Sequence, residues 1–330
     1  MLFEDGRIEG RVESVGDASG VAAVVSGGEL GSRKGVNLPG VGIDVDLITD
    51  EDEAELRLAA RANADFVAAS FVRDAADVYR IADTLEAYDG EDIPVIAKIE
   101  RAGAVENLTG IVEAADGVMV ARGDLGVECP LEDVPIIQKR IIRTCVEAGV
   151  PVITATEMLD SMVHSPRPTR AEASDVANAV LDGTDAVMLS GETAIGEHPA
   201  AVVETMDRIV REVEHSAEYA ETREQRVPAA TDDSRTEALA RSARYLARDL
   251  GASTVVAVSE SGYTARKTAM FRPGVPVVAT TPTARVRRQL APSWGVQPVQ
   301  TASAGDLEPV LDNAAAHAPS RRNTSISSRR

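Results

Sequence analysis

Residues 94–100 read Pro-Val-Ile-Ala-Lys-Ile-Glu, a short β-branched apolar run that a proline opens and a carboxylate closes. Such a run predicts a buried strand. Side chains at positions i and i+2 of a strand project to the same side, so Lys98 and Glu100 are expected to emerge together at one end of a sheet. A lone Lys-x-Glu at a strand end is more often a plain salt bridge than a functional site. The neighbouring sequence therefore decides what this pair does.

Two later apolar runs also end in polar residues. In chain order these residues are Arg122, Gly123 and Asp124 after Gly117–Ala121, and Thr154 and Thr156 after Pro151–Ile153. The carboxyl ends of parallel strands meet at one edge of a sheet, so all of these residues are expected near Lys98.

From Asp50 onward, helix and strand patterns alternate. The predicted helices are 50–62, 75–88, 102–115, 134–148 and 171–181, and the predicted strands are 65–72, 94–100, 117–121, 151–153 and 186–190. Parallel strands that are covered on both faces read as continuous apolar runs of this kind. The alternation is the pattern of a (β/α)₈ barrel, in which the chemistry lies at the carboxyl ends of the strands. Thr169 and Glu172 have capping-box spacing and are expected to open the last of these helices.

The rest of the chain divides into further segments. Residues 1–40 show two strand-like runs, 6–15 and 20–25, which cannot form a stable β domain by themselves. We expect a catalytic domain over 41–220 that ends in a helix over 200–220, a polar linker over 221–234, a second α/β domain over 235–300 and a basic, disordered tail over 301–330. In the second domain the predicted helices are 236–250, 264–271 and 284–290, and the predicted strands are 254–259 and 275–280.

The composition is strongly acidic. The formal charge is −19, from 34 basic and 53 acidic residues, and only four of the basic residues are lysines. Such a surface repels nucleic acid and anionic membranes, so neither is expected as a partner. The excess of Asp and Glu suggests a halophilic protein in a salt-rich cytosol, where a dense negative charge is screened. An acidic protein of a mesophile is the alternative.

The cysteines and the hydropathy of the chain indicate the cellular compartment in which the protein is expected. Cys129 and Cys145 have no metal-binding spacing and are expected to be reduced and unpaired. No window is apolar enough for a transmembrane helix, and the first residues do not resemble a signal peptide. We therefore expect a soluble, cytoplasmic protein.

Seven runs of this sequence, in order, resemble the pyruvate kinase family. They are residues 30–40 (LGSRKGVNLPG), 69–73 (ASFVR), 96–100 (IAKIE), 119–128 (MVARGDLGVE), 155–162 (ATEMLDSM), 166–181 and 188–193 (MLSGET). Each run alone is moderately specific, whereas the seven together are highly specific, and the resemblance as a whole covers about residues 6–299.

The resemblance implies a fold and an activity. The fold is strands four to eight of a (β/α)₈ barrel with the first three strands missing, the C-terminal half of a β lid domain in residues 1–40, and an incomplete C-terminal α/β domain. The activity is phosphoryl transfer from phosphoenolpyruvate to ADP, giving pyruvate and ATP. The family implies Mg²⁺ or Mn²⁺, K⁺ (whose ligands are missing here) and a homotetramer.

The resemblance also implies roles for single residues. Glu100 and Asp124 bind the metal, Lys98 stabilises the transferring phosphoryl group and the enolate oxygen, and the N–H groups of Gly123 and Asp124 hold the substrate carboxylate. The remaining assignments are Thr156 to the substrate and the proton donor, Lys34 to the nucleotide phosphates, Ser70 and Ser190 to the substrate or to structure, and Glu192 to a supporting or structural role. Ser259, Ser261, Gly262 and Thr264 resemble a sugar-phosphate effector cradle, where Glu260 disfavours an anion.

Three functions stay open on the sequence. The first is a pyruvate kinase whose chain is shortened, the second is a metal-dependent aldolase or lyase on a related barrel, and the third is a non-catalytic remnant that associates with an intact subunit. If the chain lacks three barrel strands, we expect it to be inactive alone and prone to aggregate or to bind another chain, because apolar surface stays in water at ~25 cal/mol per Å².

Overall fold

The computed structural model describes residues 1–3, 6, 8–17, 19–32, 35–38, 46–226, 228, 234–301 and 312 of the 330-residue chain. Lys34 and almost all of the predicted tail 301–330 therefore lie outside the described residues. The chain divides into two compact units, Met1–Cys145 with Val152–Val213, and Val146–Pro151 with Glu214–Arg330.

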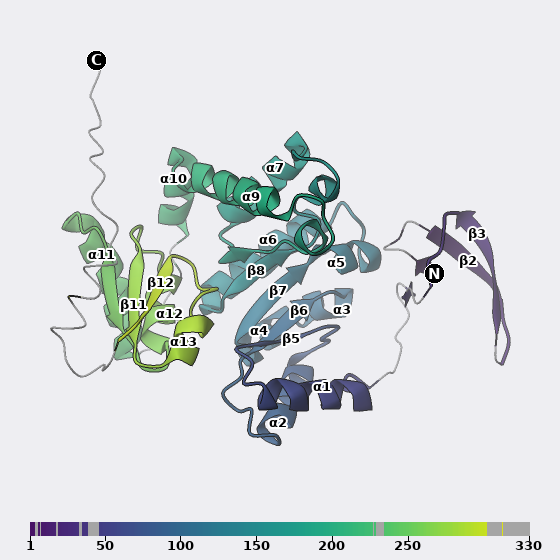
Figure 1. The fold of residues 1–330 in the computed structure, drawn as a ribbon, viewed down its shortest axis with the longest axis horizontal. Coiled ribbons are helices and arrows are strands. Elements are labelled where there is room, and N and C mark those ends of the chain that lie inside the picture. Colours follow the sequence, from purple (N-terminus) through teal and green to yellow (C-terminus); the bar gives the residue numbers. More distant parts are fainter. Residues whose placement is uncertain are drawn as a thin grey trace, which may run out of the picture. The chain divides into compact units, whose positions relative to one another are not determined.

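The first unit is built on a parallel sheet of five described strands in the order β5-β6-β7-β8-β9 (Figure 1). The strands are β5 Val67–Ala69, β6 Val95–Ile99, β7 Gly117–Ala121, β8 Val152–Ala155 and β9 Ala186–Val187. The elements between and around them are α1 Asp50–Arg61, α2 Ala75–Glu86, α3 Ala102–Glu106, α4 Leu108–Ala114, α5 Arg122–Glu128, α6 Val134–Ala148, η1 Asp160–Val163, α7 Arg170–Asp182, α8 Gly191–Ala194 and α9 Pro199–Glu214. The five strands lie where the apolar runs predicted them. Among the described residues they form an open sheet with β5 and β9 at its edges.

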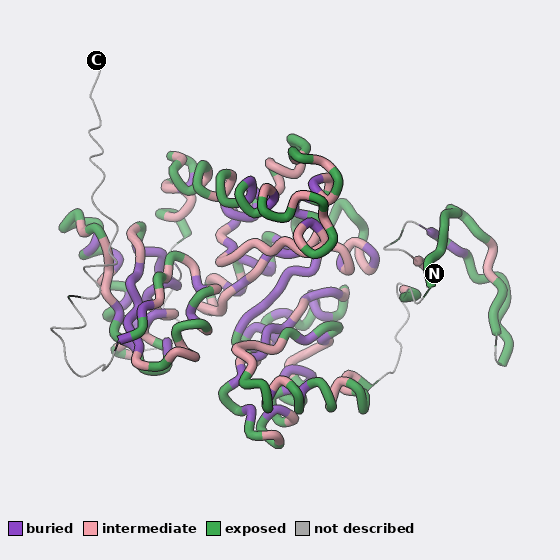
Figure 2. The backbone as a smooth tube through the Cα atoms, in the orientation of Figure 1, coloured by how far each residue is buried: buried purple, intermediate pink, exposed green. Residues whose placement is uncertain are grey.

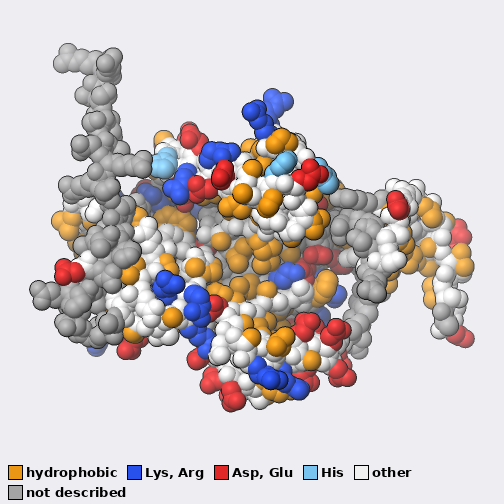
Figure 3. Space-filling view, viewed as in Figure 1, with side chains coloured by type: hydrophobic (Ala, Val, Ile, Leu, Met, Phe, Trp, Pro, Cys, Tyr) orange, Lys and Arg blue, Asp and Glu red, His pale blue; other side chains and the backbone are white. Residues whose placement is uncertain are grey.

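The middle strands of this sheet form the core of the unit. Every residue of β7 is buried, and Val95, Ala97 and Ile99 of β6 are at most 2% exposed (Figure 2). By contrast, much of α1 is exposed, and its first turn carries Asp50, Glu51, Asp52 and Glu53. Acidic side chains lie over this part of the surface in Figure 3. The apolar runs of the middle strands thus reflect burial on both faces.

Two predicted helices are each two helices in the structure. The predicted helix 102–115 is interrupted at Asn107, whose side-chain amide donates a hydrogen bond to the carbonyl of Arg73 at 3.1 Å. The predicted helix 200–220 ends at Glu214, and α10 (Ala217–Gln225) begins with Ser216 as its N-cap. Asn and Ser side chains compete for backbone groups, which favours such breaks and caps over helix interiors. The end of α10 also occupies the first residues of the predicted linker 221–234.

The capping box at the start of α7 is present as predicted. Thr169 Oγ1 accepts from the backbone N–H of Glu172 at 3.2 Å, and Glu172 Oε2 accepts from the backbone N–H of Thr169 at 2.6 Å. The other oxygen of Glu172 accepts from the N–H of Ser161 at 2.6 Å. This residue therefore ties the segment after β8 to the start of α7. Both cysteines are free, as predicted.

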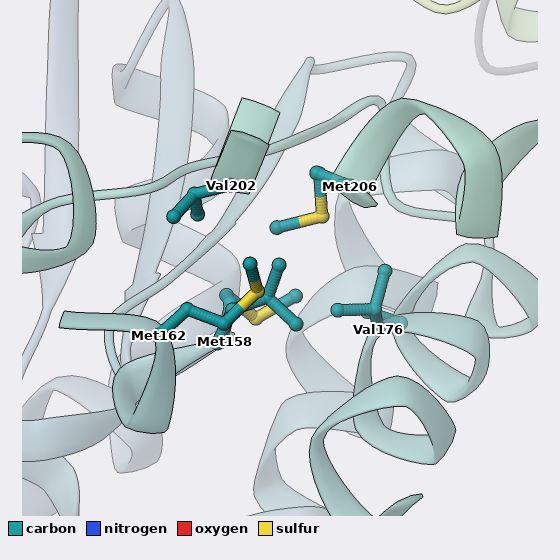
Figure 4. Close-up of a cluster of buried hydrophobic side chains, with 7 residues drawn as sticks. Met158, Met162, Val176, Val202 and Met206 are labelled. Carbon is teal, nitrogen blue, oxygen red and sulfur yellow. The ribbon is translucent and has the colours of Figure 1, made fainter. Parts of the chain in front are cut away.

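A buried cluster lies under the segment that follows β8. Figure 4 shows Met158 and Met162 from this segment converging with Val176 of α7 and with Val202 and Met206 of α9. Met158 and Met162 are completely buried. Burial of side chains of this size stabilises by about 1.5–3 kcal/mol each, so the cluster fixes where the β8 segment continues.

The N-terminal sheet of the first unit is antiparallel, in the order β3-β2-β1-β4. Its strands are β1 Leu2–Phe3, β2 Ile8–Val15, β3 Gly20–Ser26 and β4 Val36–Asn37. The two longer strands match the predicted runs, whereas the two short ones were not predicted. Val15 and Val24 are 81% and 72% exposed, so this small sheet buries few of its apolar side chains.

The second unit holds a three-stranded parallel sheet in the order β10-β11-β12. Its elements besides α10 are α11 Arg235–Asp249, β10 Val255–Val258, α12 Tyr263–Met270, β11 Val277–Thr281, α13 Ala284–Gln289 and β12 Val296–Gln300. Strand β12 was not predicted, because Pro298 and two glutamines interrupt its apolar pattern. In the described part of the chain, none of the helices has the length and hydropathy needed to cross a membrane.

Candidate active site

Lys98 and Glu100 lie together at the carboxyl end of β6, as the alternation of a strand predicts. The ammonium nitrogen of Lys98 is 2.5 Å from Oε1 of Glu100 and donates to Oγ of Ser70 at 2.7 Å. Ser70 follows β5, so the lysine joins the ends of two neighbouring strands. The Lys98 side chain is 24% exposed and the Glu100 side chain only 1%. The cation therefore reaches solvent while its carboxylate partner is buried.

The other oxygen of Glu100 is held by the backbone. Oε2 of Glu100 accepts from the N–H of Phe71 at 2.6 Å, and Phe71 has a φ of 57°. A bulky residue in the left-handed region is strained and persists only where its surroundings hold it. The guanidinium of Arg101 lies over the Phe71 ring at 4.9 Å from the centroid. The turn after β5 is thus fixed so that its N–H points at the Glu100 carboxylate.

Burial raises the pKa of Glu100 above its ordinary value. Hydrogen bonds from Lys98 and Phe71 offset part of this effect, and the nearby negative charge of Asp124 adds to it. Asp124 lies in the first turn of α5, directly after β7. Two carboxylates that share one site repel each other, and a cation between them relieves this repulsion.

Gly123 and Thr156 are brought together from the ends of β7 and β8. The N–H of Gly123 donates to Oγ1 of Thr156 at 2.9 Å. Thr156 and Glu157 have φ values of 68° and 51°. A β-branched residue in the left-handed region is a genuine outlier, and such outliers concentrate at functional sites. The Thr156 hydroxyl is therefore held in a defined place beside the first turn of α5.

Ser190 and Glu192 form a separate pair after β9. Glu192 is 2% exposed; its Oε2 accepts from the N–H of Ser190 at 2.8 Å, and its Oε1 accepts from the N–H of Leu159 at 3.1 Å. These contacts tie the segment after β8 to the segment after β9. Among the described residues, no hydrogen bond or ion pair joins Ser190 to Lys98.

The donor set of the site suits a hard divalent cation. Across the ranges that the structure describes, no group of three or more His, Cys, Asp and Glu side chains could hold a metal. The carboxylates of Glu100 and Asp124 are the oxygen ligands that Mg²⁺ prefers, and this metal usually takes one or two carboxylates and completes its shell with substrate and water. The two carboxylates therefore fit a Mg²⁺ or Mn²⁺ ion that takes its remaining ligands from substrate and water. They are too few for a metal ion held by protein ligands alone.

The predicted effector loop lies in the second unit. Gly262 has a φ of 82° and precedes α12, and Ser259 is 5% exposed. The guanidinium of Arg266 donates to the carbonyl of Ser261 at 3.3 Å. Thr264 lies in the first turn of α12. The sequence interpretation considered only Glu260 as the local charge and missed that one helical turn brings Arg266 back to the loop.

Sequence reasoning also missed residues that hold the site. Phe71 acts through its backbone N–H, which every residue except proline has, so its residue type gives no sign of this role. Arg122 was noted only as part of a polar run, and its contacts with the segment after β8 depend on the fold. Lys34, which was assigned to the nucleotide, lies outside the described residues.

These features define an α/β protein whose polar site, with a lysine and two carboxylates, lies at the carboxyl ends of parallel strands. The family model "Pyruvate kinase, barrel domain" matches residues 1–203, and "Pyruvate kinase, alpha/beta domain" matches residues 237–325. The chain belongs to the pyruvate kinase family.

Curated relatives agree with the family models. The chain is 46% identical over 316 residues to "Pyruvate kinase" of Geobacillus stearothermophilus, which is 95% of this chain and 54% of that protein. It is 42% identical over 314 residues to the Clostridium acetobutylicum protein of the same name, covering 95% and 66%. For "Pyruvate kinase 2" of Synechocystis sp. the identity is 47% over 304 residues, covering 91% and 50%. The chain thus spans about half the length of most of the curated relatives it matches.

Proposed function

We propose that this chain carries the site at which a pyruvate kinase transfers a phosphoryl group from phosphoenolpyruvate to ADP. The observation that supports this most is the position of the Lys98 ammonium group, 2.5 Å from Glu100 and 2.7 Å from Ser70 at the carboxyl edge of the sheet. Phosphoryl transfer depends on positioning and on neutralising the charge of the transferring group. A compact ammonium charge at this edge suits both tasks.

Glu100 and Asp124 would hold Mg²⁺ or Mn²⁺. When bound, the metal supplies a positive charge that polarises the phosphoryl oxygens of the substrates. The protein's own part is to keep Glu100 buried and oriented through the N–H of Phe71. The pyruvate kinase family generally uses K⁺ as well, and none of the residues assigned here is proposed as its ligand.

The substrate would lie between the ends of β6, β7 and β8. The N–H groups of Gly123 and Asp124 bind its carboxylate, where the glycine leaves room for close approach. Lys98 stabilises the negative charge that develops on the enolate oxygen as the phosphoryl group leaves. The Thr156 hydroxyl orients the proton donor that converts enolpyruvate into pyruvate. Ser70 and Ser190 contact the substrate or support its neighbours.

The remaining proposals rest on the family. Lys34 binds the nucleotide phosphates, and Ser259, Ser261, Gly262 and Thr264 form a loop that resembles an effector cradle, in which Glu260 disfavours an anion. The five-stranded sheet corresponds to strands four to eight of a (β/α)₈ barrel, in a catalytic domain over 41–220 that follows a lid segment over 1–40. Residues 221–234 form the linker, 235–300 the C-terminal α/β domain and 301–330 a tail.

The proposed setting is a cytoplasm rich in salt, with a homotetramer as the assembly. The charge of −19 supports a halophilic character, because molar salt screens repulsion between surface carboxylates. Stability that is equal in molar and millimolar KCl would contradict it.

A chimera tests the proposed activity. The 330-residue chain is extended at both ends with the flanking segments of the Geobacillus stearothermophilus relative, so that every site residue named here comes from this chain. With Mg²⁺ and K⁺ the chimera is expected to convert phosphoenolpyruvate and ADP into pyruvate and ATP. A folded chimera without this activity would contradict the proposal. Cleavage or condensation of a pyruvate-derived enolate would favour an aldolase or lyase instead.

A further inference from the structure

The guanidinium group of Arg122 is saturated by contacts within the first unit. Its Nε donates to the carbonyl of Ala155 at 3.1 Å, and its Nη2 donates to the carbonyl of Thr156 at 2.6 Å and contacts Sδ of Met158 at 2.8 Å. Its Nη1 donates to Asp175 at 2.5 Å and to Oε1 of Gln138 at 3.4 Å. These five contacts match the five N–H donors of an arginine.

Three of the five contacts fall on the turn that carries Thr156. The two carbonyls that Arg122 holds are those on either side of the strained Thr156 φ of 68°. Strain of this kind costs about 1–3 kcal/mol per residue and persists only where the surroundings hold it. A planar, forked cation can hold two neighbouring carbonyls at once, whereas a lysine offers a single point charge.

The turn is fixed from its other end as well. Met158 is completely buried in the cluster of η1, α7 and α9 (Figure 4). Asp175 of α7 orients the guanidinium of Arg122, and the Arg122 side chain is only 10% exposed. The turn at Thr156 is therefore held in two ways. Met158 is packed in the core on its C-terminal side, and the Arg122 guanidinium binds the carbonyls of Ala155 and Thr156. Oγ1 of Thr156 faces the N–H of Gly123, the residue next to Arg122.

We propose that Arg122 is a positioning residue that fixes the Thr156 hydroxyl relative to the substrate. It touches no reacting atom in this assignment and acts through the backbone of the Thr156 turn. The effect on the substrate rests on the proposed function, because that function assigns a role to the Thr156 hydroxyl. The contacts by which Arg122 holds the turn do not depend on it. The Arg122 guanidinium thereby connects the first turn of α5, which binds the substrate carboxylate, to Thr156, which orients the proton donor.

The hold on the turn is tested first, without substrate. Hydrogen–deuterium exchange of the 330-residue chain is measured by mass spectrometry for wild type, Arg122→Lys and Asp175→Asn. Exchange at residues 156–158 should be at least tenfold faster in Arg122→Lys and faster to a smaller degree in Asp175→Asn. Exchange in β7 should be unchanged in both. The control Arg211→Lys makes the same chemical change on the exposed face of α9, where Arg211 pairs with Asp207.

The effect on the substrate is tested by calorimetry with Mn²⁺ and phosphoenolpyruvate. In the chimera described above, Arg122→Lys should weaken binding of phosphoenolpyruvate to the Mn²⁺-loaded protein about tenfold, and binding of Mn²⁺ itself should change less than twofold. In a Thr156→Val background, Arg122→Lys should change phosphoenolpyruvate affinity less than twofold. Such non-additivity is expected only if Arg122 acts through the Thr156 hydroxyl.

The outcomes separate the two proposals. Unchanged exchange at residues 156–158 overturns the hold on the turn, whatever the substrate does. Losses of affinity that multiply in the double variant, or a parallel loss of Mn²⁺ affinity, make Arg122 a structural residue and overturn its positioning role. A folded wild-type chimera that binds Mn²⁺ but no phosphoenolpyruvate contradicts the proposed function and, with it, the assigned effect of Arg122 on the substrate.

Discussion

The ammonium group of Lys98 and the hydroxyl of Ser70 are joined by a 2.7 Å hydrogen bond that links the end of β6 to the turn after β5. The same ammonium lies 2.5 Å from the buried carboxylate of Glu100. Lys98 thus has a fixed position without losing its access to solvent.

Replacing Lys98 by methionine removes the cation and leaves a side chain of similar length. In the chimera described above, Lys98→Met should lower phosphoryl transfer by about 10³-fold, because the charge that develops on the substrate loses its stabilising partner. Binding of Mg²⁺ should persist. The control is Lys139→Met, which removes a half-exposed lysine of α6 that pairs with the buried Asp182 at the end of α7. Turnover of Lys98→Met within threefold of wild type would remove Lys98 from the mechanism.

Asp124→Asn tests the carboxylate pair. Because a neutral amide is a weaker ligand for a hard cation, the affinity for Mn²⁺ should fall by about tenfold. Titration calorimetry on the 330-residue chain measures this directly. Asp83→Asn, on the exposed side of α2, makes the same change outside the site and should leave the affinity unaltered. Equal affinities in wild type and Asp124→Asn would rule out Asp124 as a ligand.

Asp77 supports the turn after β5 and gives stability a pH dependence. Its carboxylate accepts from the N–H, Nε and Nη2 of Arg73 at 2.9–3.0 Å, and the hydrogen bonds from Arg73 lower its pKa below 3.8 although burial opposes them. The folded pKa is thus below the unfolded one. The stabilisation is complete above the unfolded value and is lost as the pH falls through the folded value.

The variant Asp77→Asn should therefore lower the free energy of unfolding by about 1.5–3 kcal/mol at pH 6, the range for hydrogen bonds to a charged group. The difference between wild type and variant should shrink at pH 3 and below. Urea unfolding at both pH values provides the measurement, with Asp83→Asn as the exposed counterpart. A difference that stays constant with pH would show that Asp77 does not titrate as described.

Trp294 is the chain's single tryptophan and reports on the second unit. Its Nε1 donates to the hydroxyl of Tyr219 at 2.7 Å, and the guanidinium of Arg272 lies over its ring at 4.8 Å from the centroid. Tyr219→Phe removes the acceptor and should shift the tryptophan emission and lower the thermal midpoint by a few degrees, for a loss of about 1 kcal/mol. Tyr245→Phe, on the exposed side of α11, should do neither. Emission unchanged in Tyr219→Phe would contradict the contact.

Much of the parallel sheet was predictable because its strands are buried on both faces. The runs around Val95 and Val118 have no alternating polar residues, which is the pattern of a covered parallel strand. Lys98 and Glu100 could be placed together from strand geometry alone. The short strands β1 and β4 have no pattern to detect, and Pro298 obscured β12.

The supporting contacts of the site could not be predicted. Phe71 contributes a backbone N–H at a φ of 57°, and the carbonyls that Arg122 holds belong to a turn 33 residues away in the sequence. Such contacts depend on which strands become neighbours, and residue type carries no signal for them. The breaks at Asn107 and Ser216 had a local signal in their side chains, but apolar periodicity on both sides concealed it.

The central claim is that Lys98, Glu100 and Asp124 form one site for a divalent metal and phosphoenolpyruvate. Its most direct test is the binding of phosphoenolpyruvate to the chimera described under Proposed function, measured by titration calorimetry with and without Mn²⁺. We predict binding only when Mn²⁺ is present, weakened at least tenfold in Lys98→Met and in Asp124→Asn. Binding that does not need the metal, or that is unchanged in both variants, would contradict the account.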